Sequence, residues 1–199
     1  MNWLAHLFLS EPNVDSRLGN LLADIVKGSA RQQLNSRLQR GIQCHQFIDA
    51  YTDSHIIFQR SKQRISSKYR RFAGILIDVF YDHFLAKNWS KYSHISLEEF
   101  TDEIYRSFLT YPAVLPVETS AVIHRMAAED WLSSYRHVAG VEKALAGISS
   151  RLSMRRRDRT FDLHLAVGEL TAHYNDLEQD FYQFFPDLWL AVQTQCFSL

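Results

Sequence analysis

Residues 75–85 are the part of the sequence that most limits how this chain can fold. They read ILIDVFYDHFL, so apolar side chains occupy every face of any helix that they form. A helix that is apolar all round is typical of the centre of a fold, where it is covered on all sides. We therefore expect residues 75–85 to form the buried central helix of this protein.

The rest of the chain favours further helices. Only 7 glycines and 4 prolines interrupt 199 residues, and no segment alternates apolar and polar residues as a strand does. A chain of this length suits one domain with a real core. We predict an all-α fold, a single helical bundle over residues 1–199. Besides the central helix, the expected helices cover residues 15–28, 34–52, 62–71, 97–109, 120–135, 140–152 and 161–185.

The overall charge excludes some classes of partner. Basic and acidic residues balance at 22 each, so no net charge draws the chain to nucleic acid or to an anionic membrane. The apolar N-terminal segment is interrupted by His6, has no basic region before it and is too short to span a bilayer. We expect a cytoplasmic protein that binds neither nucleic acid nor membrane. Cys44 and Cys196 suggest no disulfide framework, and Cys44 is expected to be a small buried hydrophobe.

Two carboxylates interrupt the central helix. Asp78 and Asp82 are four residues apart, so they project from one helical face, where each carboxylate loses hydration. Such a pair is tolerated when a cation lies between the carboxylates, when they share a proton, or when basic side chains meet them. The structural alternative is a buried ion pair with an arginine. His83 follows directly and adds a metal ligand or a proton carrier.

Ionisable residues also interrupt other apolar segments. Asp24 lies within the sequence LLADIV, and His6 lies within LAHLF. His45 and Asp49 are four residues apart on one face of an expected helix, and Asp53 extends that face. Each residue alone is more often structural, but the same irregularity in separate segments favours one shared metal site. Imidazole and carboxylate ligands without thiolates suit Mn²⁺, Fe²⁺, Mg²⁺ or Zn²⁺.

Several segments, taken in order, resemble the acyl carrier protein phosphodiesterase family. The segment from Gly74 to Trp89, which contains the central helix, is long enough to be specific. The resemblance runs from residue 1 to about residue 190. The other segments that carry it are residues 2–7, 19–24, 45–55, 131–135 and 174–186.

This resemblance implies a helical fold distantly similar to HD-domain phosphohydrolases. It also implies a divalent metal, typically Mn²⁺ with Mg²⁺ and Fe²⁺ as alternatives. The expected reaction is hydrolysis of the phosphodiester that joins 4'-phosphopantetheine to a serine of holo-acyl carrier protein. The candidate metal ligands are His6, Asp24, His45 and Asp78. The candidate catalytic residues are His83, Asp49 and Asp82.

The chain departs from the family pattern at two positions. Gln46 stands where we expect an arginine, which removes a charge that would contact phosphate. Ile56 stands where we expect a proline after His55, and this change affects only a turn. The arginine's absence concerns phosphate binding rather than the metal ligands.

A run of arginines follows residue 150. Its members Arg155, Arg156 and Arg157 are candidates for docking an acidic partner, and acyl carrier proteins are strongly acidic. The alternative is an ordinary solvated loop or helix end. A second basic set consists of Lys62, Arg64, Lys68, Arg70 and Arg71.

Two other functions fit the same residues. One is a metal-dependent phosphohydrolase that acts on a nucleotide or another small phosphodiester. The other is a helical protein that binds acyl carrier protein without catalysis. Assays with separate substrates distinguish the two enzymes, and metal analysis separates both from a binding protein.

Overall fold

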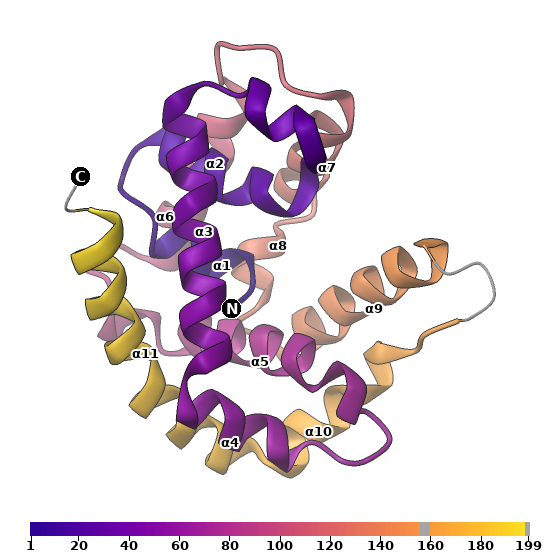
Figure 1. Ribbon diagram of the computed structural model, residues 1–199. Helices are drawn as coiled ribbons and strands as arrows, with labels where there is room; N and C mark the ends of the chain where they lie inside the picture. Colours follow the sequence, from indigo (N-terminus) through magenta and orange to yellow (C-terminus); the bar gives the residue numbers. More distant parts are fainter. Residues whose placement is uncertain (156–159, 198–199) are drawn as a thin grey trace.

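The computed structural model describes residues 1–155 and 160–197, which form helices and connecting segments without a strand (Figure 1). The predicted all-α fold is confirmed for this part of the chain. The α-helices are α1 (Trp3–Phe8), α2 (Val14–Ile25), α3 (Ser36–Ser54), α4 (Ile56–Arg64), α5 (Ala73–Lys87), α6 (Leu97–Leu109), α7 (Val117–Ala128), α8 (Trp131–Ser134), α9 (Val138–Arg155), α10 (Val167–Ala172) and α11 (Tyr174–Cys196). No helix among them is long and apolar enough to cross a lipid bilayer.

Helix α5 is the central helix that its sequence predicts. Leu76, Ile77, Phe80 and Leu85 are fully shielded from solvent, and burial of each side chain contributes about 1.5–3 kcal/mol. The helix packs against α1, α4, α9 and α11, and Figure 1 shows it in the middle of the molecule. Polar groups on α5 are therefore held by a tightly packed support.

Helices α2 and α3 approach each other closely because each has a glycine at the contact. A Cβ atom on Gly19 would collide with the carbonyl oxygen of Leu38, and one on Gly41 would collide with that of Ser16. Only glycine allows two backbones to come so near. The contact brings the face of α3 that carries His45 close to α2.

Asparagine side chains cap both of these helices. Asn13 accepts a hydrogen bond from the backbone N–H of Ser16, and Asn35 accepts from the N–H groups of Arg37 and Leu38. Such caps satisfy backbone donors that have no partner within the helix. They fix where α2 and α3 begin.

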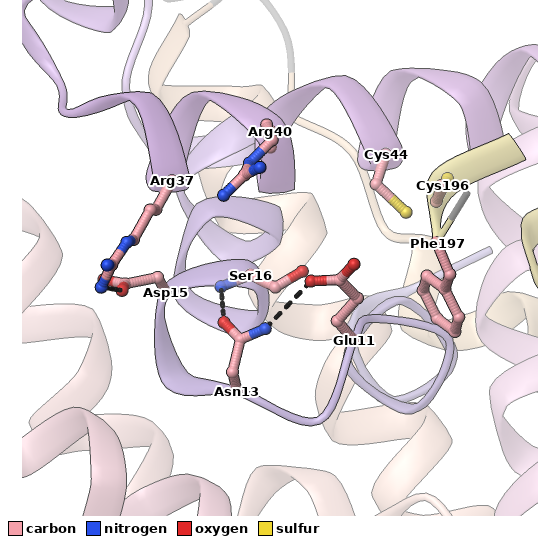
Figure 2. A pocket seen from close by; sticks show the side chains of 9 residues that line it. All are labelled: Glu11, Asn13, Asp15, Ser16, Arg37, Arg40, Cys44, Cys196 and Phe197. Carbon is pink, nitrogen blue, oxygen red and sulfur yellow. Dashed lines mark hydrogen bonds and ion pairs between the residues drawn. The ribbon is translucent and has the colours of Figure 1, made fainter. Parts of the chain in front are cut away.

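A pocket of about 230 Å³ beside this pair of helices brings the two cysteines together (Figure 2). Cys44 on α3 is buried, as predicted, and Cys196 ends α11 on the other wall of the pocket. Both thiols are free. On the same side of the molecule Arg37 lies 3.6 Å from Asp15, which links α3 to α2.

Some helix boundaries follow the sequence and others differ. Helix α6 covers residues 97–109 as predicted and begins with a capping box between Ser96 and Glu99. The helix expected over 120–135 is instead divided into α7 and α8, because Asp130 adopts a left-handed conformation with φ of 43°. The helix expected over 62–71 ends at Arg64, and a short 3-10 turn at Arg70–Phe72 precedes α5.

The helix expected over 161–185 also differs in the structure. It is divided at His173 into α10 and α11, and α11 continues through Pro186 to Cys196. Proline lacks a backbone N–H and disfavours a helix interior. Beyond it, however, Leu188 and Val192 are fully buried. Packing of this last part of α11 outweighs the local cost of the proline.

Candidate metal centre and the pocket around it

The short helix α1 is fixed to the central helix by Asp82. The buried carboxylate of Asp82 accepts hydrogen bonds from the backbone N–H groups of Asn2 at 3.2 Å, Leu4 at 2.8 Å and Ala5 at 3.4 Å. A helix of six residues is unstable alone, and these N–H groups have no acceptor inside it. Burial raises the pKa of Asp82 to about 7, although the hydrogen bonds oppose that rise. Asp82 thereby sets the position of α1.

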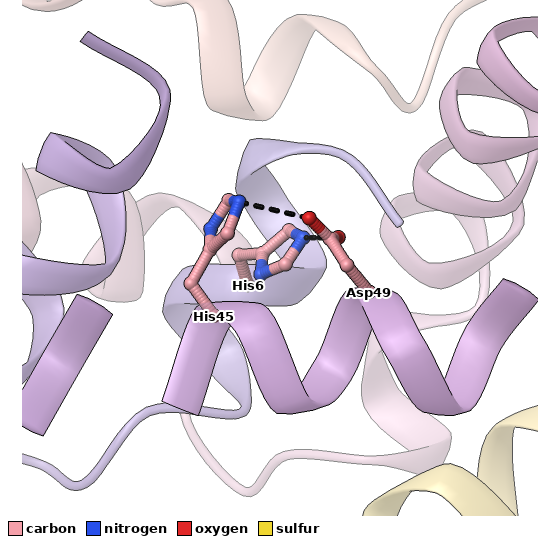
Figure 3. Close-up of side chains that lie close together, drawn as sticks. All are labelled: His6, His45 and Asp49. Atoms are coloured by element: carbon pink, nitrogen blue, oxygen red, sulfur yellow. Dashed lines mark ion pairs between the residues drawn. The ribbon is translucent and has the colours of Figure 1, made fainter. Parts of the chain in front are cut away.

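His6 on α1 meets His45 and Asp49 on α3 (Figure 3). The Nε2 atom of His6 lies 3.2 Å from Oδ1 of Asp49, and Nε2 of His45 lies 3.1 Å from Oδ2 of the same residue. The two imidazole rings stack with their centroids 4.0 Å apart. One nitrogen from each histidine and one oxygen of Asp49 lie within 4.8 Å of one another. This spacing allows one cation to contact all three side chains.

Asn20 on α2 decides which ring nitrogen of His45 carries the proton. The side-chain nitrogen of Asn20 donates to the carbonyl oxygen of His6 at 3.2 Å and to Oγ of Ser10 at 2.9 Å. Its side-chain oxygen therefore faces Nδ1 of His45, 2.9 Å away, so Nδ1 carries the proton. In neutral His45 the Nε2 lone pair is then directed at carboxylate oxygens. A bound cation relieves that repulsion, and so does a second proton on the ring.

The electrostatics of the cluster favour a neutral His6 and an ionised Asp49. Burial lowers the pKa of His6 to about 4, and the neighbouring His45 adds to the effect. Burial would raise the pKa of Asp49, but its contacts with the imidazole rings of His45 and His6 hold that pKa well below its usual range. A neutral imidazole and an ionised carboxylate are the protonation states that bind metal.

Two further predicted residues border the cluster. Oδ1 of Asp24 on α2 lies 3.8 Å from Nε2 of His45, and its other oxygen accepts a 2.8 Å hydrogen bond from the indole of Trp3. Oδ1 of Asp78 on α5 lies 2.6 Å from the amino group of Met1. Burial raises the pKa of Asp78, and the nearby amino group opposes this rise. The cation that meets Asp78 in the structure is thus an amino group rather than an arginine.

These groups line a pocket of about 290 Å³. Asp24, Asp49 and Asp78 place three carboxylates on its wall. Two basic residues also line it: Met1, whose amino group lies beside Asp78, and Arg151 from α9, whose guanidinium lies over the ring of Trp3 at 5.5 Å from its centroid. A pocket with this excess of carboxylates repels a phosphate unless a further cation is bound. Its mixture of imidazole and carboxylate donors suits Mn²⁺, Fe²⁺, Mg²⁺ or Zn²⁺.

His83 lies outside this group. Its Nδ1 is 2.8 Å from the carbonyl oxygen of Tyr135, and its Nε2 is 2.8 Å from the hydroxyl of Tyr174. The structure therefore brings together His6, Asp24, His45, Asp49 and Asp78, whereas Asp82 lies behind α1 and His83 joins α5 to α11 and the end of α8.

Two residues of this site were not predicted from the sequence. Asn20 was not assigned a role, although it interrupts an apolar segment as Asp24 does. Arg151 was grouped with the basic run, but it lines the pocket. Of the docking candidates, Arg156 and Arg157 lie outside the described residues, and for Arg155 only the helical backbone is described. In the second basic set, Arg64 lies 2.9 Å from the buried Asp180, so its role is structural.

Comparison with known proteins identifies the family. The family model described as acyl carrier protein phosphodiesterase matches residues 1–188. The chain belongs to the acyl carrier protein phosphodiesterase family. The resemblance found in the sequence is thereby confirmed.

Relatives with that name match over most of their length. The protein of Serratia proteamaculans is 33% identical over 189 residues, which are 94% of this chain and 95% of the relative. The protein of Yersinia enterocolitica is 31% identical, over 97% of this chain and 98% of the relative. That of Escherichia coli O45:K1 is 34% identical, over 94% of both chains. No solved structure matches the chain, so the expected likeness to HD-domain phosphohydrolases stays a prediction.

The departure from the family pattern at Gln46 has a clear location. Gln46 is exposed on α3, next to His45 and one turn before Asp49. It is not among the residues that line the pocket, whereas Arg151 is. Among the described residues, Arg151 is therefore the arginine that lines this pocket.

Proposed function

We propose that this chain hydrolyses the phosphodiester of holo-acyl carrier protein and releases 4'-phosphopantetheine and the apo-protein. The observation that carries the proposal is the convergence of His6, His45 and Asp49, the last two of which line an acidic pocket. Membership of the acyl carrier protein phosphodiesterase family supports the choice of substrate. We further propose that the enzyme is cytoplasmic, and its two free cysteines are consistent with a reducing compartment.

The proposed reaction depends on a divalent metal, Mn²⁺ in first place and Mg²⁺ or Fe²⁺ as alternatives. His6, His45 and Asp49 would hold it, with Asp24 beside them. Such an ion supplies positive charge against the phosphate oxygens and lowers the pKa of bound water.

The protein's own residues orient these groups and balance their charge. Asn20 keeps the proton of His45 on Nδ1, so that Nε2 faces the pocket. Arg151 lies on the pocket wall and is suited to bind a phosphate oxygen. It would thereby replace the arginine that is expected at position 46, where this chain has Gln46. Asp78 keeps the amino group of Met1 beside the pocket.

Asp82 and His83 receive positioning roles in this proposal. The carboxylate of Asp82 is engaged by backbone N–H groups of α1, and both nitrogens of His83 are engaged by tyrosine residues. Neither residue lines the pocket. Neither His83 nor His45, whose Nε2 would hold the metal, is therefore assigned as the proton donor, and the serine oxygen would take its proton from water in the pocket.

Mass spectrometry of holo-acyl carrier protein tests the proposal. Incubation with enzyme and Mn²⁺ should convert the holo-protein to the apo-protein, and a chelator should prevent the conversion. His45→Ala should remove activity and bound metal, whereas His124→Ala, an exposed histidine on α7, should change neither. An unchanged holo-protein mass with metal-loaded wild type would overturn the proposal. Turnover that survives the chelator would overturn its metal dependence.

A further inference from the structure

A second pocket, of about 360 Å³, opens directly beside the metal pocket. The two pockets share Asn2, Ile148 and Arg151 in their walls. Helices α1, α7, α8 and α9 enclose the second pocket. Its volume falls in the range of about 300–1,000 Å³ that is typical of sites for small organic ligands. A ligand with its phosphate in the metal pocket can therefore extend past Arg151 into this second pocket.

The walls of the second pocket are mainly apolar. The indole rings of Trp3 and Trp131 stack with centroids 5.7 Å apart, and Val122, Ile148 and Met154 add aliphatic surface. Such surface favours an uncharged chain over a charged one.

Polar groups occupy limited parts of these walls. Near the metal pocket the hydroxyl of Tyr135 accepts a 2.6 Å hydrogen bond from the side chain of Asn2, which leaves its own proton to donate. At another part of the wall Glu129 pairs with Arg125 at 3.2 Å and with Lys143 at 3.0 Å, so one carboxylate meets two cations and a net positive charge remains. The pocket thus offers mainly apolar contact with a few hydrogen-bonding groups, and its charged residues carry no excess of negative charge.

We infer that the second pocket binds the pantetheine arm of the substrate while its phosphate lies in the metal pocket. The arm is an uncharged chain with a dimethyl-substituted carbon, two amides and a terminal thiol. Its apolar parts suit the pair of tryptophans, and its amides suit the hydroxyl of Tyr135 and the side chain of Asn2. The carrier protein itself, on the serine side of the phosphorus, stays outside. This inference rests on the proposed function, but binding of the arm is measurable without catalysis.

Gly147 allows the pocket to be filled without disturbing the fold. It lines the pocket on α9, and a Cβ atom built on it meets no atom within 4 Å. Leucine favours a helix more than glycine does, so Gly147→Leu should fold. Gly168 on α10 gives a matched control, because its Cβ position is equally open and it lies outside the pocket.

Binding of pantetheine, which carries no phosphate, tests the inference on chelator-treated protein. Titration should change the tryptophan fluorescence of wild type and of Gly168→Leu in a saturable way, because Trp3 and Trp131 line the pocket. In Gly147→Leu the affinity should fall by at least about tenfold, since the side chain occupies the space of the ligand. Absence of saturable binding to wild type, or equal affinity in Gly147→Leu, would overturn the inference.

Kinetics separates this inference from the proposed function. The ratio of kcat/KM for holo-acyl carrier protein to kcat/KM for bis(p-nitrophenyl) phosphate, which lacks the arm, should fall about tenfold in Gly147→Leu. That ratio should not change in Gly168→Leu. If wild type hydrolyses holo-acyl carrier protein and the ratio is the same in both variants, the arm binds elsewhere. If wild type leaves the holo-protein intact yet binds pantetheine at Gly147, the proposed function fails while the pocket assignment stands.

Discussion

The side-chain amide of Asn20 lies between two segments that both supply candidate ligands. Its nitrogen donates to the backbone carbonyl of His6, and its oxygen accepts from the ring of His45. One buried residue thereby aligns α1 and α3 and fixes a tautomer. Hydrogen-bonding partners of this kind hold a metal-binding histidine in orientation and strengthen its remaining nitrogen as a ligand.

Asn20→Ala should weaken metal binding by about 10- to 100-fold, because the ring of His45 loses the acceptor that holds its Nδ1 proton. Titration of Mn²⁺ by calorimetry measures the change. Ser10→Ala is the control, since Ser10 belongs to the same hydrogen-bond network but does not touch His45. Equal losses of affinity in both variants would mean that Asn20 acts only through folding stability.

His6 should make the stability of the metal-free protein depend on pH. Its pKa falls from 6.5 in the unfolded chain to about 4 in the fold because of burial. Between these values the unfolded chain binds a proton that the folded protein does not, so stability present above pH 6.5 is lost as pH falls towards 4. The loss should be on the order of 3 kcal/mol. Asp49, whose pKa is lowered, extends the loss to still lower pH.

Urea unfolding in the presence of a chelator, at pH values from 4 to 7, measures this dependence. His6→Gln cannot take up the proton, so its free energy of unfolding should change less over the same interval. Identical pH profiles for wild type and His6→Gln would contradict a buried neutral His6.

The candidate ligands were visible in the sequence because each breaks an apolar pattern, but their separate roles were not. Asp78 and Asp82 look equivalent at i and i+4, yet one borders the pocket and the other receives N–H groups from α1. Sequence spacing predicts which side chains share one face of a helix, but it does not predict which groups of other helices those side chains contact. His83 was grouped with them for the same reason.

At the scale of elements, α1 depends on α5. Helix α1 is only six residues long and is buried. Asp82 accepts the backbone N–H groups at its N-terminus, which would otherwise be buried without an acceptor. His6 therefore takes its position from a residue that is distant in sequence. A change at Asp82 should act on the metal centre through the placement of α1.

Asp82→Asn and Asp82→Ala should behave differently. Asparagine keeps one acceptor oxygen for α1 but turns its NH2 group towards another N–H of that helix, so it should lose stability and bound metal to a smaller extent than alanine. Alanine leaves buried N–H groups without an acceptor and should cost at least about 2 kcal/mol, with loss of bound metal. Thermal unfolding, metal content and holo-acyl carrier protein turnover measure these effects. A folded, metal-binding but inactive Asp82→Asn would instead assign Asp82 to catalysis.

The elements could be predicted where local signals and packing agree. Helix α6 has both a capping box and regular apolar spacing, and its limits were correct. The helix expected over residues 161–185 was predicted too short, because burial of Leu188 and Val192 carries α11 beyond Pro186. The left-handed backbone of Asp130 has no clear sequence signal, so the division between α7 and α8 was missed.

A protein substrate is expected to contact the surface around the pocket as well as the pocket itself. Arg151 lies on α9, and the basic run continues from the end of that helix to residues 156 and 157. The docking role of the run stays a prediction, because residues 156 and 157 lie outside the described part of the chain.

Arg155→Glu, Arg156→Glu and Arg157→Glu made together should raise KM for holo-acyl carrier protein about tenfold at low ionic strength, because steering of an acidic partner is lost. The difference from wild type should shrink as salt is added. Arg70→Glu with Arg71→Glu gives a comparison at another exposed basic segment. Steady-state kinetics at two salt concentrations measures the effect. An unchanged KM at low salt would make the run an ordinary solvated segment.

The close contact of Gly19 with Gly41 has a consequence for the order in which the chain folds. Helices α2 and α3 are consecutive, so their contact closes only the loop of residues 26–35, and short loops close quickly and at little entropic cost. We expect this helical pair to form on the ribosome before α5 has left the exit tunnel. Asp24, His45 and Asp49 would then already be neighbours, while His6 must wait for Asp82. If the proposed metal binds there, a nascent chain of this kind would capture the ion before its core is complete, and metal supply during translation would then be part of the folding pathway.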